Sequence, residues 1–194
     1  MNKIRKSAVL ICILILLFTG VSIFVYLQYG RQTDPVAQSA SPVPTATAEQ
    51  GNYVLEIPEI GISVPIALNV NGADQDAYNQ ALEGGVAQLL GTALPGHSGN
   101  TFIFGHSSFY TSAEGNYKEV FKDLNDLEEG NELTISNSAS TFTYQVTDKQ
   151  IVSPDRVDLT AQIYTKKQLT LMTCWPIGTD KERLVVISNL VSQK

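Results

Sequence analysis

The chain has 194 residues and a formal net charge of −6. Four basic residues precede the first acidic residue, Asp34, so the remainder carries 9 basic and 19 acidic side chains, a net of −10. Such an acidic chain repels a phosphate backbone, which excludes nucleic acid as an expected partner. After the N-terminal region, enough chain remains for one domain with its own hydrophobic core.

The N-terminal region predicts a membrane anchor. Residues 7–29 carry no charge and consist mainly of Ile, Leu, Val and Phe. As an α-helix they would span about 34 Å, enough for the hydrocarbon core of a bilayer. Residues 1–6 supply positive charge, which predicts a cytoplasmic N-terminus and an extracytoplasmic remainder in a single-pass cell-membrane protein. A cleaved signal peptide is the alternative, but no Ala-x-Ala-like site directly follows residues 8–18.

A spacer is predicted between this anchor and the domain. Residues 30–50 contain Pro35, Pro42 and Pro44 among Ala, Ser, Thr and Gln, and they lack hydrophobic periodicity. This composition predicts an extended linker outside the membrane. The domain is then expected to comprise residues 51–194.

The domain shows mainly strand signals. Apolar runs at Tyr53–Ile57 and Ile60–Ile66 predict the first two strands. Pro58 and Pro65 are expected at strand ends or edges, because proline cannot donate to a β-ladder. The later predicted strands are Thr101–Phe104, Leu133–Ile135, Thr141–Val146 with a continuation over Asp148–Val152, Leu169–Cys174 and Arg183–Val191.

Two segments carry helical signals. Asp74 is a candidate N-cap for a short helix that ends at Gly84. A stronger pattern lies at Tyr117–Glu129, where apolar residues follow the i, i+3, i+4, i+7 spacing of one buried helix face. Asn116 and Gly130 are its candidate cap residues. Many short strands with two minor helices indicate a mainly β barrel or sandwich.

Cys174 is the only cysteine outside residues 7–29. Because extracytoplasmic proteins usually pair their cysteines, a lone thiol there is either buried and inert or chemically used. Its surroundings favour use, since Pro176 follows its strand and Arg183 opens the next one. If these strands pair antiparallel, the guanidinium lies near the thiol, where it favours the thiolate or stabilises an oxyanion.

The two histidines lie in similar triplets, Gly96-His97-Ser98 and Gly105-His106-Ser107. His97 lies inside a predicted loop and is interpreted as a solvated turn residue. His106 leaves the end of the strand Thr101–Phe104, where a strand end places a side chain accurately. His106 is therefore the predicted partner of the thiol.

Other kinds of site have weak support. One available cysteine and two histidines fall short of four zinc ligands, and neither Cys-x-x-Cys nor His-Glu-x-x-His occurs. The acidic clusters Asp123–Glu129 and Asp155–Asp158 are interpreted as solvated surface, with a calcium site as the alternative. We therefore expect that no cofactor is required. Trp175 either packs over the mouth of a barrel or forms a wall of a substrate groove.

Thr170-Leu171-Met172-Thr173-Cys174 resembles the Thr-Leu-x-Thr-Cys signature of the sortases, which are cell-surface transpeptidases. Arg183 matches the arginine that follows the cysteine in that family. Gly99-Asn100 with Gly105-His106 resembles the family's Gly-Asn…Gly-His segment, which also selects His106 over His97. The opening strands are similar as well, so the resemblance covers about residues 53–191.

The resemblance implies an eight-stranded β-barrel and an LPxTG-like sorting motif on secreted proteins as the substrate. Cys174 would attack the carbonyl of the motif's threonine and form a thioacyl-enzyme. His106 would protonate the departing amine and deprotonate the incoming one, while Arg183 would stabilise the oxyanion or hold the substrate. The implied acceptor is an amine of a cell-wall peptide or a pilin lysine.

The subclass and two alternatives remain to be considered. Asp34-Pro35 is followed by Val36 instead of the aromatic residue of lidded pilin sortases, which resembles a single-anchor, lidless type near class D or E. One alternative is a cysteine endopeptidase of another class, although no histidine follows Cys174 as in papain-like enzymes. The other is a non-catalytic, membrane-tethered binding module.

Overall fold

The computed structural model describes residues 52–108 and 115–194. All described residues belong to one compact unit, Gln50–Lys194. The predicted anchor and spacer lie outside the described residues. Among the residues that are described, no helix is long and apolar enough to span a membrane.

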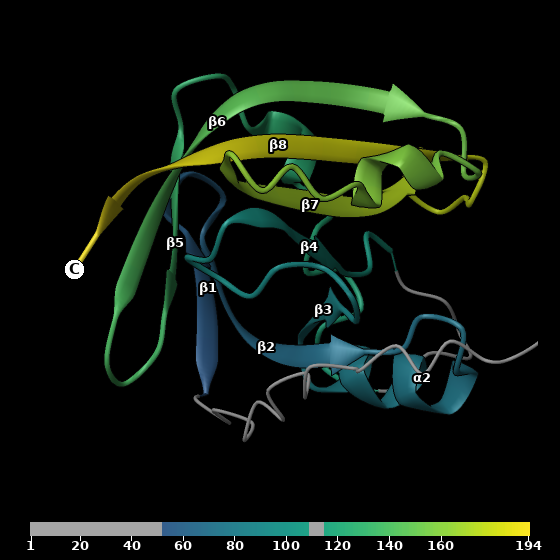
Figure 1. Cartoon of the computed structure of the whole chain (residues 1–194). Coiled ribbons are helices and arrows are strands. Elements are labelled where there is room, and N and C mark those ends of the chain that lie inside the picture. Colours follow the sequence, from purple (N-terminus) through teal and green to yellow (C-terminus); the bar gives the residue numbers. More distant parts are fainter. Residues whose placement is uncertain (1–51, 109–114) are drawn as a thin grey trace, which may run out of the picture. The chain divides into compact units, whose positions relative to one another are not determined.

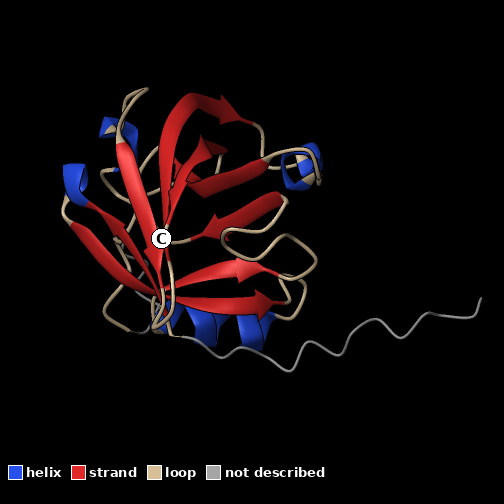
Figure 2. Ribbon diagram, turned by 60° about the vertical axis from the view of Figure 1, so that its left-hand side comes forward, coloured by secondary structure: helices blue, strands red, loops and turns tan. Residues whose placement is uncertain are grey.

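Eight strands close into a barrel in the order β1-β2-β3-β4-β7-β8-β6-β5 (Figures 1 and 2). The predicted mainly β, eight-stranded barrel is therefore confirmed. The strands are β1 (Tyr53–Ile57), β2 (Ile62–Val70), β3 (Val86–Leu89), β4 (Gly99–Phe104), β5 (Glu132–Ser136), β6 (Thr141–Val152), β7 (Lys167–Trp175) and β8 (Glu182–Gln193). In the described part of the chain, the helical elements are α2 (Gln75–Glu83) and three 3₁₀ turns, η1 (Pro58–Ile60), η2 (Leu124–Asp126) and η3 (Val157–Thr160).

The main hydrophobic core fills the inside of the barrel. Side chains alternate between the two faces of a strand, so every second residue points inward. On β7 the inward residues Leu169 and Leu171 are fully buried, and they join a cluster with Leu184 and Val186 of β8. The alternate residues of β7, Thr170, Met172 and Cys174, therefore point to the outer face of the barrel.

The predicted helix over Tyr117–Glu129 is wrong. This segment folds as consecutive turns that include η2, and its hydrogen bonds reach three residues back, as from the N–H of Leu124 to the carbonyl of Phe121 at 3.2 Å. Turns with a period of three residues keep nearly the same face buried as an α-helix does. Phe121, Leu124 and Leu127 accordingly lie fully buried in the core. The apolar spacing correctly indicated burial but not the type of helix.

Strand β3 has no counterpart among the predicted strands. It has four residues and pairs parallel with β2 and antiparallel with β4. These neighbouring strands, rather than the β-propensity of its own residues, make this segment a strand. The predicted strand Ile60–Ile66 begins at Ile62 instead, after η1. Pro65 lies inside β2, opposite Val54 of β1, just before the pairing with β3 begins at Ile66.

A second apolar cluster lies on the outer face of β3, β4 and β7, against α2. The predicted N-cap is confirmed, because the Asp74 carboxylate accepts hydrogen bonds from the N–H groups of Asp76 and Ala77. Tyr78 of α2 stacks on Phe104 of β4, with ring centroids 5.2 Å apart and ring planes at 10°. The helix thus fixes an aromatic surface on the outside of the barrel.

Candidate active site

Cys174 and Arg183 lie directly opposite each other on neighbouring strands. β7 pairs antiparallel with β8, and the two residues are Cα partners in this pair, as the predicted hairpin requires. Opposed residues of an antiparallel pair share one face, with Cβ atoms about 4.5–5.5 Å apart. Both side chains are half-buried, so the thiol and the guanidinium are accessible from the outer face.

Strand β4 brings His106 to the same end of the barrel. β4 runs parallel to β7, with Phe104 as the partner of Met172. The N–H of Gly105 donates to the Met172 carbonyl at 3.2 Å, so the ladder continues one residue past β4. If the same register is extended by one more residue, His106 lies opposite Cys174. The three candidate residues therefore gather at one end of three adjacent strands.

Two side-chain hydrogen bonds bind the His106 segment to β7. The Thr173 hydroxyl donates to the Gly105 carbonyl at 2.8 Å, and the Ser107 hydroxyl donates to the Cys174 carbonyl at 2.8 Å. Both residues are only 2% exposed. A net contribution of about 0.5–1.5 kcal/mol is typical of one such bond, and leaving a buried partner unpaired costs more. The two bonds bracket His106 and hold it in register with Cys174.

Gly105 is required by the packing behind the histidine. A Cβ at this position would lie 2.8 Å from the ring of Phe121 and 3.0 Å from a methyl group of Val86. The N–H of Phe121 also donates to the His106 carbonyl at 2.8 Å. The turn segment that was predicted as a helix therefore supports the histidine directly from the core.

The site contains a partly buried histidine and a positively charged arginine, in a chain whose net charge is negative. Burial lowers the pKa of His106 below its usual 6.5, because desolvation disfavours the imidazolium. Nη1 of Arg183 donates to the backbone carbonyls of Asp180 and Glu182, each at 2.9 Å. Among the described residues no carboxylate forms an ion pair with Arg183. These bonds orient the guanidinium without neutralising its charge.

A groove leads away from Cys174 along the outer face of β4 and β7. Its volume is about 310 Å³, at the lower end of the usual range for ligand pockets. Phe102, Phe104 and Met172 supply an apolar floor, and Tyr78 of α2 also lines it. The charged residues that line it are two arginines, Arg156 and Arg183. An extended, largely apolar peptide without a cationic side chain suits such a surface.

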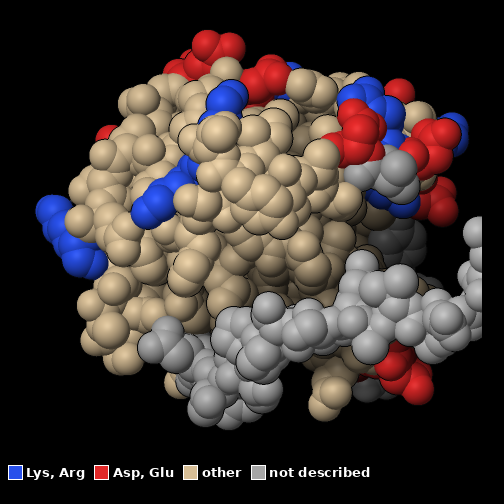
Figure 3. Space-filling model, viewed as in Figure 1, with Lys and Arg blue, Asp and Glu red and all other residues tan. Residues whose placement is uncertain are grey.

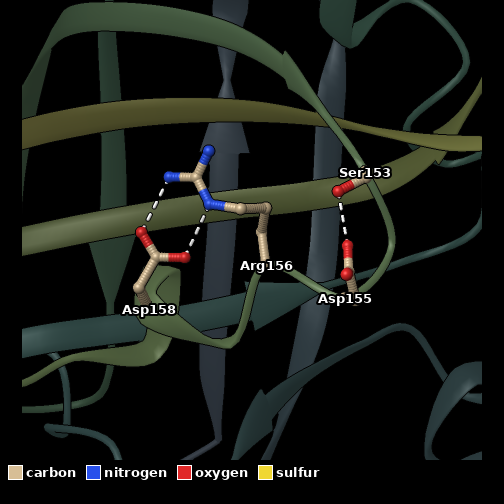
Figure 4. Close-up of polar contacts among 4 residues, drawn as sticks. All are labelled: Ser153, Asp155, Arg156 and Asp158. Atoms are coloured by element: carbon tan, nitrogen blue, oxygen red, sulfur yellow. Dashed lines mark hydrogen bonds and ion pairs between the residues drawn. The ribbon is translucent and has the colours of Figure 1, made fainter.

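The connection between β6 and β7, residues 153–166, carries the second arginine. Arg156 binds Asp158 through two bonds, Nε to Oδ1 at 2.6 Å and Nη2 to Oδ2 at 2.7 Å (Figure 4). This pairing lowers the pKa of Asp158, and a hydrogen bond from Ser153 lowers that of Asp155. Charged side chains gather in the upper right of Figure 3, near η3, while the centre of that face is mostly uncharged.

Two other residues singled out in the sequence lie apart from the groove. His97 is exposed in the loop before β4, with its Nδ1 3.2 Å from the Pro95 carbonyl, as suits a turn residue. Trp175 packs against the main core and is not part of the groove lining, which favours the packing interpretation. Within residues 52–108 and 115–194, no three His, Cys, Asp or Glu side chains are grouped to hold a metal ion.

Comparison with known proteins agrees with this geometry. The protein-family model that describes the sortase domain matches residues 55–191 of this chain. The chain belongs to the sortase family. Sortase D of Bacillus subtilis (strain 168) is 29% identical over 165 residues, which cover 84% of this chain and 74% of that protein. Sortase SrtE1 of Streptomyces coelicolor is 26% identical over 155 residues, which cover 75% of this chain and 42% of that protein.

Solved sortase structures share the fold. A sortase D5 transpeptidase of Clostridium perfringens superposes with a TM-score of 0.60 at 27% identity, covering 73% of this chain and 79% of that one. Sortase C-1 of Actinomyces oris gives a TM-score of 0.60 at 31% identity, with coverage of 72% and 73%. This sortase is accordingly a cysteine transpeptidase.

Proposed function

We propose that this sortase cleaves an LPxTG-like sorting motif on secreted or surface proteins and transfers the product to an amine. The main support is that Cys174 and Arg183 line the groove, and that the β4–β7 register brings His106, which is outside the groove lining, next to Cys174. On β7 the groove is lined by Met172, Thr173 and Cys174, and Phe102 and Phe104 of β4 lie beside them. This apolar floor next to the thiol supports an extended, largely apolar peptide as the occupant.

Each of the three residues has a defined role in the proposed reaction. The Cys174 thiolate attacks the carbonyl carbon of the motif's threonine, and the carbonyl oxygen becomes an oxyanion beside Arg183. The C–N bond then breaks, and His106 gives its proton to the departing amine. An incoming amine attacks the thioester, loses a proton to His106, and releases the thiolate of Cys174, which restores the starting state. A new amide replaces the old one, so atoms and charges balance without a cofactor.

The setting of the reaction is a further part of the proposal. Residues 7–29 anchor the chain in the cell membrane, and residues 30–50 hold the domain outside it. The acceptor is then a cell-wall peptide or a pilin lysine. Similarity to proteins named sortase D and sortase SrtE1 supports a type near class D or E. Alkaline extraction of membranes tests the anchor, and activity after EDTA treatment tests whether calcium is required.

The test of the activity is acceptor-dependent ligation. The full chain in detergent is incubated with labelled sorting-motif peptides, with and without an amine acceptor. The chain's other cysteine, Cys12, serves as the control. Ligation that needs the acceptor, persists in Cys12→Ala and vanishes in Cys174→Ala supports the proposal. Cleavage at the same rate with and without acceptor would instead favour the endopeptidase. No turnover across a broad motif library, together with a Cys174 that resists alkylation, would favour the binding module.

A further inference from the structure

One wall of the groove is formed by the β6–β7 connection. This connection leaves β6 at Val152, which is the partner of Arg183, and it joins β7 at Lys167, which is the partner of Gly99. It therefore leads from the end of β7 that carries Cys174 to the opposite end of that strand. Its groove-lining residues are Pro154, Arg156 and Thr160.

The wall has few apolar contacts of its own. Leu159 packs against the second apolar cluster, but the side chains of residues 161–167 are exposed, with the exception of Gln162, which is half-buried. A segment with so few buried contacts opens at a low free-energy cost unless polar contacts hold it. The polar contacts of Gln162 therefore contribute to the position of the wall, together with the bond from the Gly99 N–H to the Lys166 carbonyl at 2.7 Å.

The side-chain amide of Gln162 pairs with the backbone of Asn100 at the start of β4. The Asn100 N–H donates to Oε1 of Gln162 at 3.0 Å, and Nε2 of Gln162 donates to the Asn100 carbonyl at 3.1 Å. Nε2 also donates to the Thr160 carbonyl at 2.9 Å. The two bonds to Asn100 reproduce the exchange of N–H and carbonyl bonds in a hydrogen-bonded strand pair.

Asn100 extends this contact to β7. Its side chain is buried, at 1% exposure, and its Nδ2 donates to the Leu159 carbonyl at 2.8 Å. Its Oδ1 accepts the hydroxyl of Thr170 at 2.8 Å, and Thr170 is on the same face of β7 as Cys174. We call Gln162, Asn100 and Thr170 the amide clamp. It links the wall of the groove to the strand that carries the nucleophile.

Gly99 provides the space for the clamp. A Cβ at this position would lie 2.6 Å from Oε1 of Gln162 and 2.9 Å from the Cβ of Ala93. Its φ of +121° is also unfavourable for a residue with a side chain. The Gly-Asn pair in the sequence thus has a structural reason, because the glycine admits the amide of Gln162 and Asn100 binds it.

We propose that Gln162 is a positioning residue that, through Asn100 and Thr170, holds the β6–β7 connection as a pre-formed wall of the peptide groove. The inference rests on the proposed function in one respect, namely that the occupant of the groove is a sorting peptide. A wall that is ordered before binding spares the peptide the entropy cost of ordering it. The clamp therefore lowers KM and leaves the reacting atoms unchanged.

Hydrogen exchange of the full chain tests the clamp without any substrate. Gln162→Met keeps the size of the side chain and removes its amide, and Gln80→Met on the exposed face of α2 is the matched control. Losing three hydrogen bonds should speed the exchange of the Asn100 amide and of residues 157–166 about tenfold or more. The amides of β8 should not change. Wild-type protection in Gln162→Met would overturn the proposal.

Kinetics then separates a positioning role from a purely structural one. With a sorting peptide, Gln162→Met and Thr170→Val should raise KM about threefold to tenfold at unchanged kcat and unchanged alkylation of Cys174 by iodoacetamide. If Gln162→Met fails to fold, Gln162→Glu replaces it, since its carboxylate lacks the donor and faces two carbonyls. Faster exchange with an unchanged KM, or a parallel loss of kcat and alkylation, would overturn the positioning role. If the wild type ligates no peptide, the proposed function fails, and the exchange experiment still decides the clamp.

Discussion

The Thr173 hydroxyl donates to the carbonyl of Gly105 at 2.8 Å, so the residue before Cys174 is bonded to the residue before His106. The sequence separation of these two residues is 68, and the parallel pairing of β4 and β7 brings them together. The Ser107 hydroxyl makes the reverse connection to Cys174. Two side-chain hydrogen bonds thus hold the backbone around His106 next to the backbone around Cys174, at the ends of two paired strands.

Removing the Thr173 hydroxyl should affect stability and catalysis together. Thr173→Val leaves the buried Gly105 carbonyl without this partner, which should lower the free energy of unfolding by about 1–3 kcal/mol. It should also lower kcat, because His106 loses part of its support. Urea unfolding and peptide ligation measure the two effects. Thr143→Val, at a half-buried position of β6, is the control, and an equal effect of both substitutions would contradict the role of this bond.

Arg183 should act through both its charge and its shape. Arg183→Ala removes a donor group from beside the oxyanion, which should lower kcat by about 10²–10³-fold. Arg183→Lys keeps the charge but not the planar set of donors, so we expect only partial activity. Single-turnover acylation rates measure this effect, and Lys167→Ala at the other end of β7 is the control. Wild-type acylation in Arg183→Ala would rule out the role in oxyanion stabilisation.

The lowered pKa of His106 should make stability depend on pH. In the unfolded chain the imidazole titrates near 6.5, while burial lowers its pKa in the folded state. Protonation therefore favours unfolding, so this contribution is fully present above pH 6.5 and is lost as pH falls through the lower, folded value. The urea midpoint should fall between pH 7.5 and pH 5. In His106→Asn this fall should be smaller, and an identical fall in both proteins would contradict the assignment.

Tyr144 should stabilise the loop before β4 from inside the barrel. The Gly96 N–H donates to the Tyr144 hydroxyl oxygen at 2.8 Å, and burial raises the pKa of this tyrosine. Tyr144→Phe leaves the buried N–H without this partner, which should cost about 1–3 kcal/mol of stability. Thermal unfolding measures the loss. Tyr164→Phe, at an exposed position, should have no measurable effect, and equal melting temperatures of all three proteins would contradict this account.

The parts of the site that are local in sequence could be predicted well. Cys174 and Arg183 belong to one hairpin, so an apolar strand, a proline and a second strand were enough to place them together. The contact between β4 and β7 could not be derived from periodicity, because no local pattern specifies which strands pair. For His106, a strand-end argument and the family resemblance supplied what the pattern lacked.

The supporting residues were not predicted because their partners are distant. Ser107 and Gln162 bind groups 67 and 62 residues away, and a serine or glutamine in a loop carries no signal of such a bond. The prediction of an α-helix over Tyr117–Glu129 was wrong for a different reason, since α-helical and 3₁₀ turns bury almost the same apolar positions. The motifs Gly-Asn and Gly-His were recognised as patterns, and the structure supplies the reason for each glycine.

The most direct test of the central claim is the mass of a trapped acyl-enzyme. The full chain is mixed with a sorting-motif peptide without acceptor, quenched in acid after a short time and digested. The account predicts that the fragment containing Cys174 gains the mass of the peptide up to its threonine, and that hydroxylamine removes this mass. Cleavage of the peptide without any adduct on Cys174 would contradict the claim that this thiol is the nucleophile.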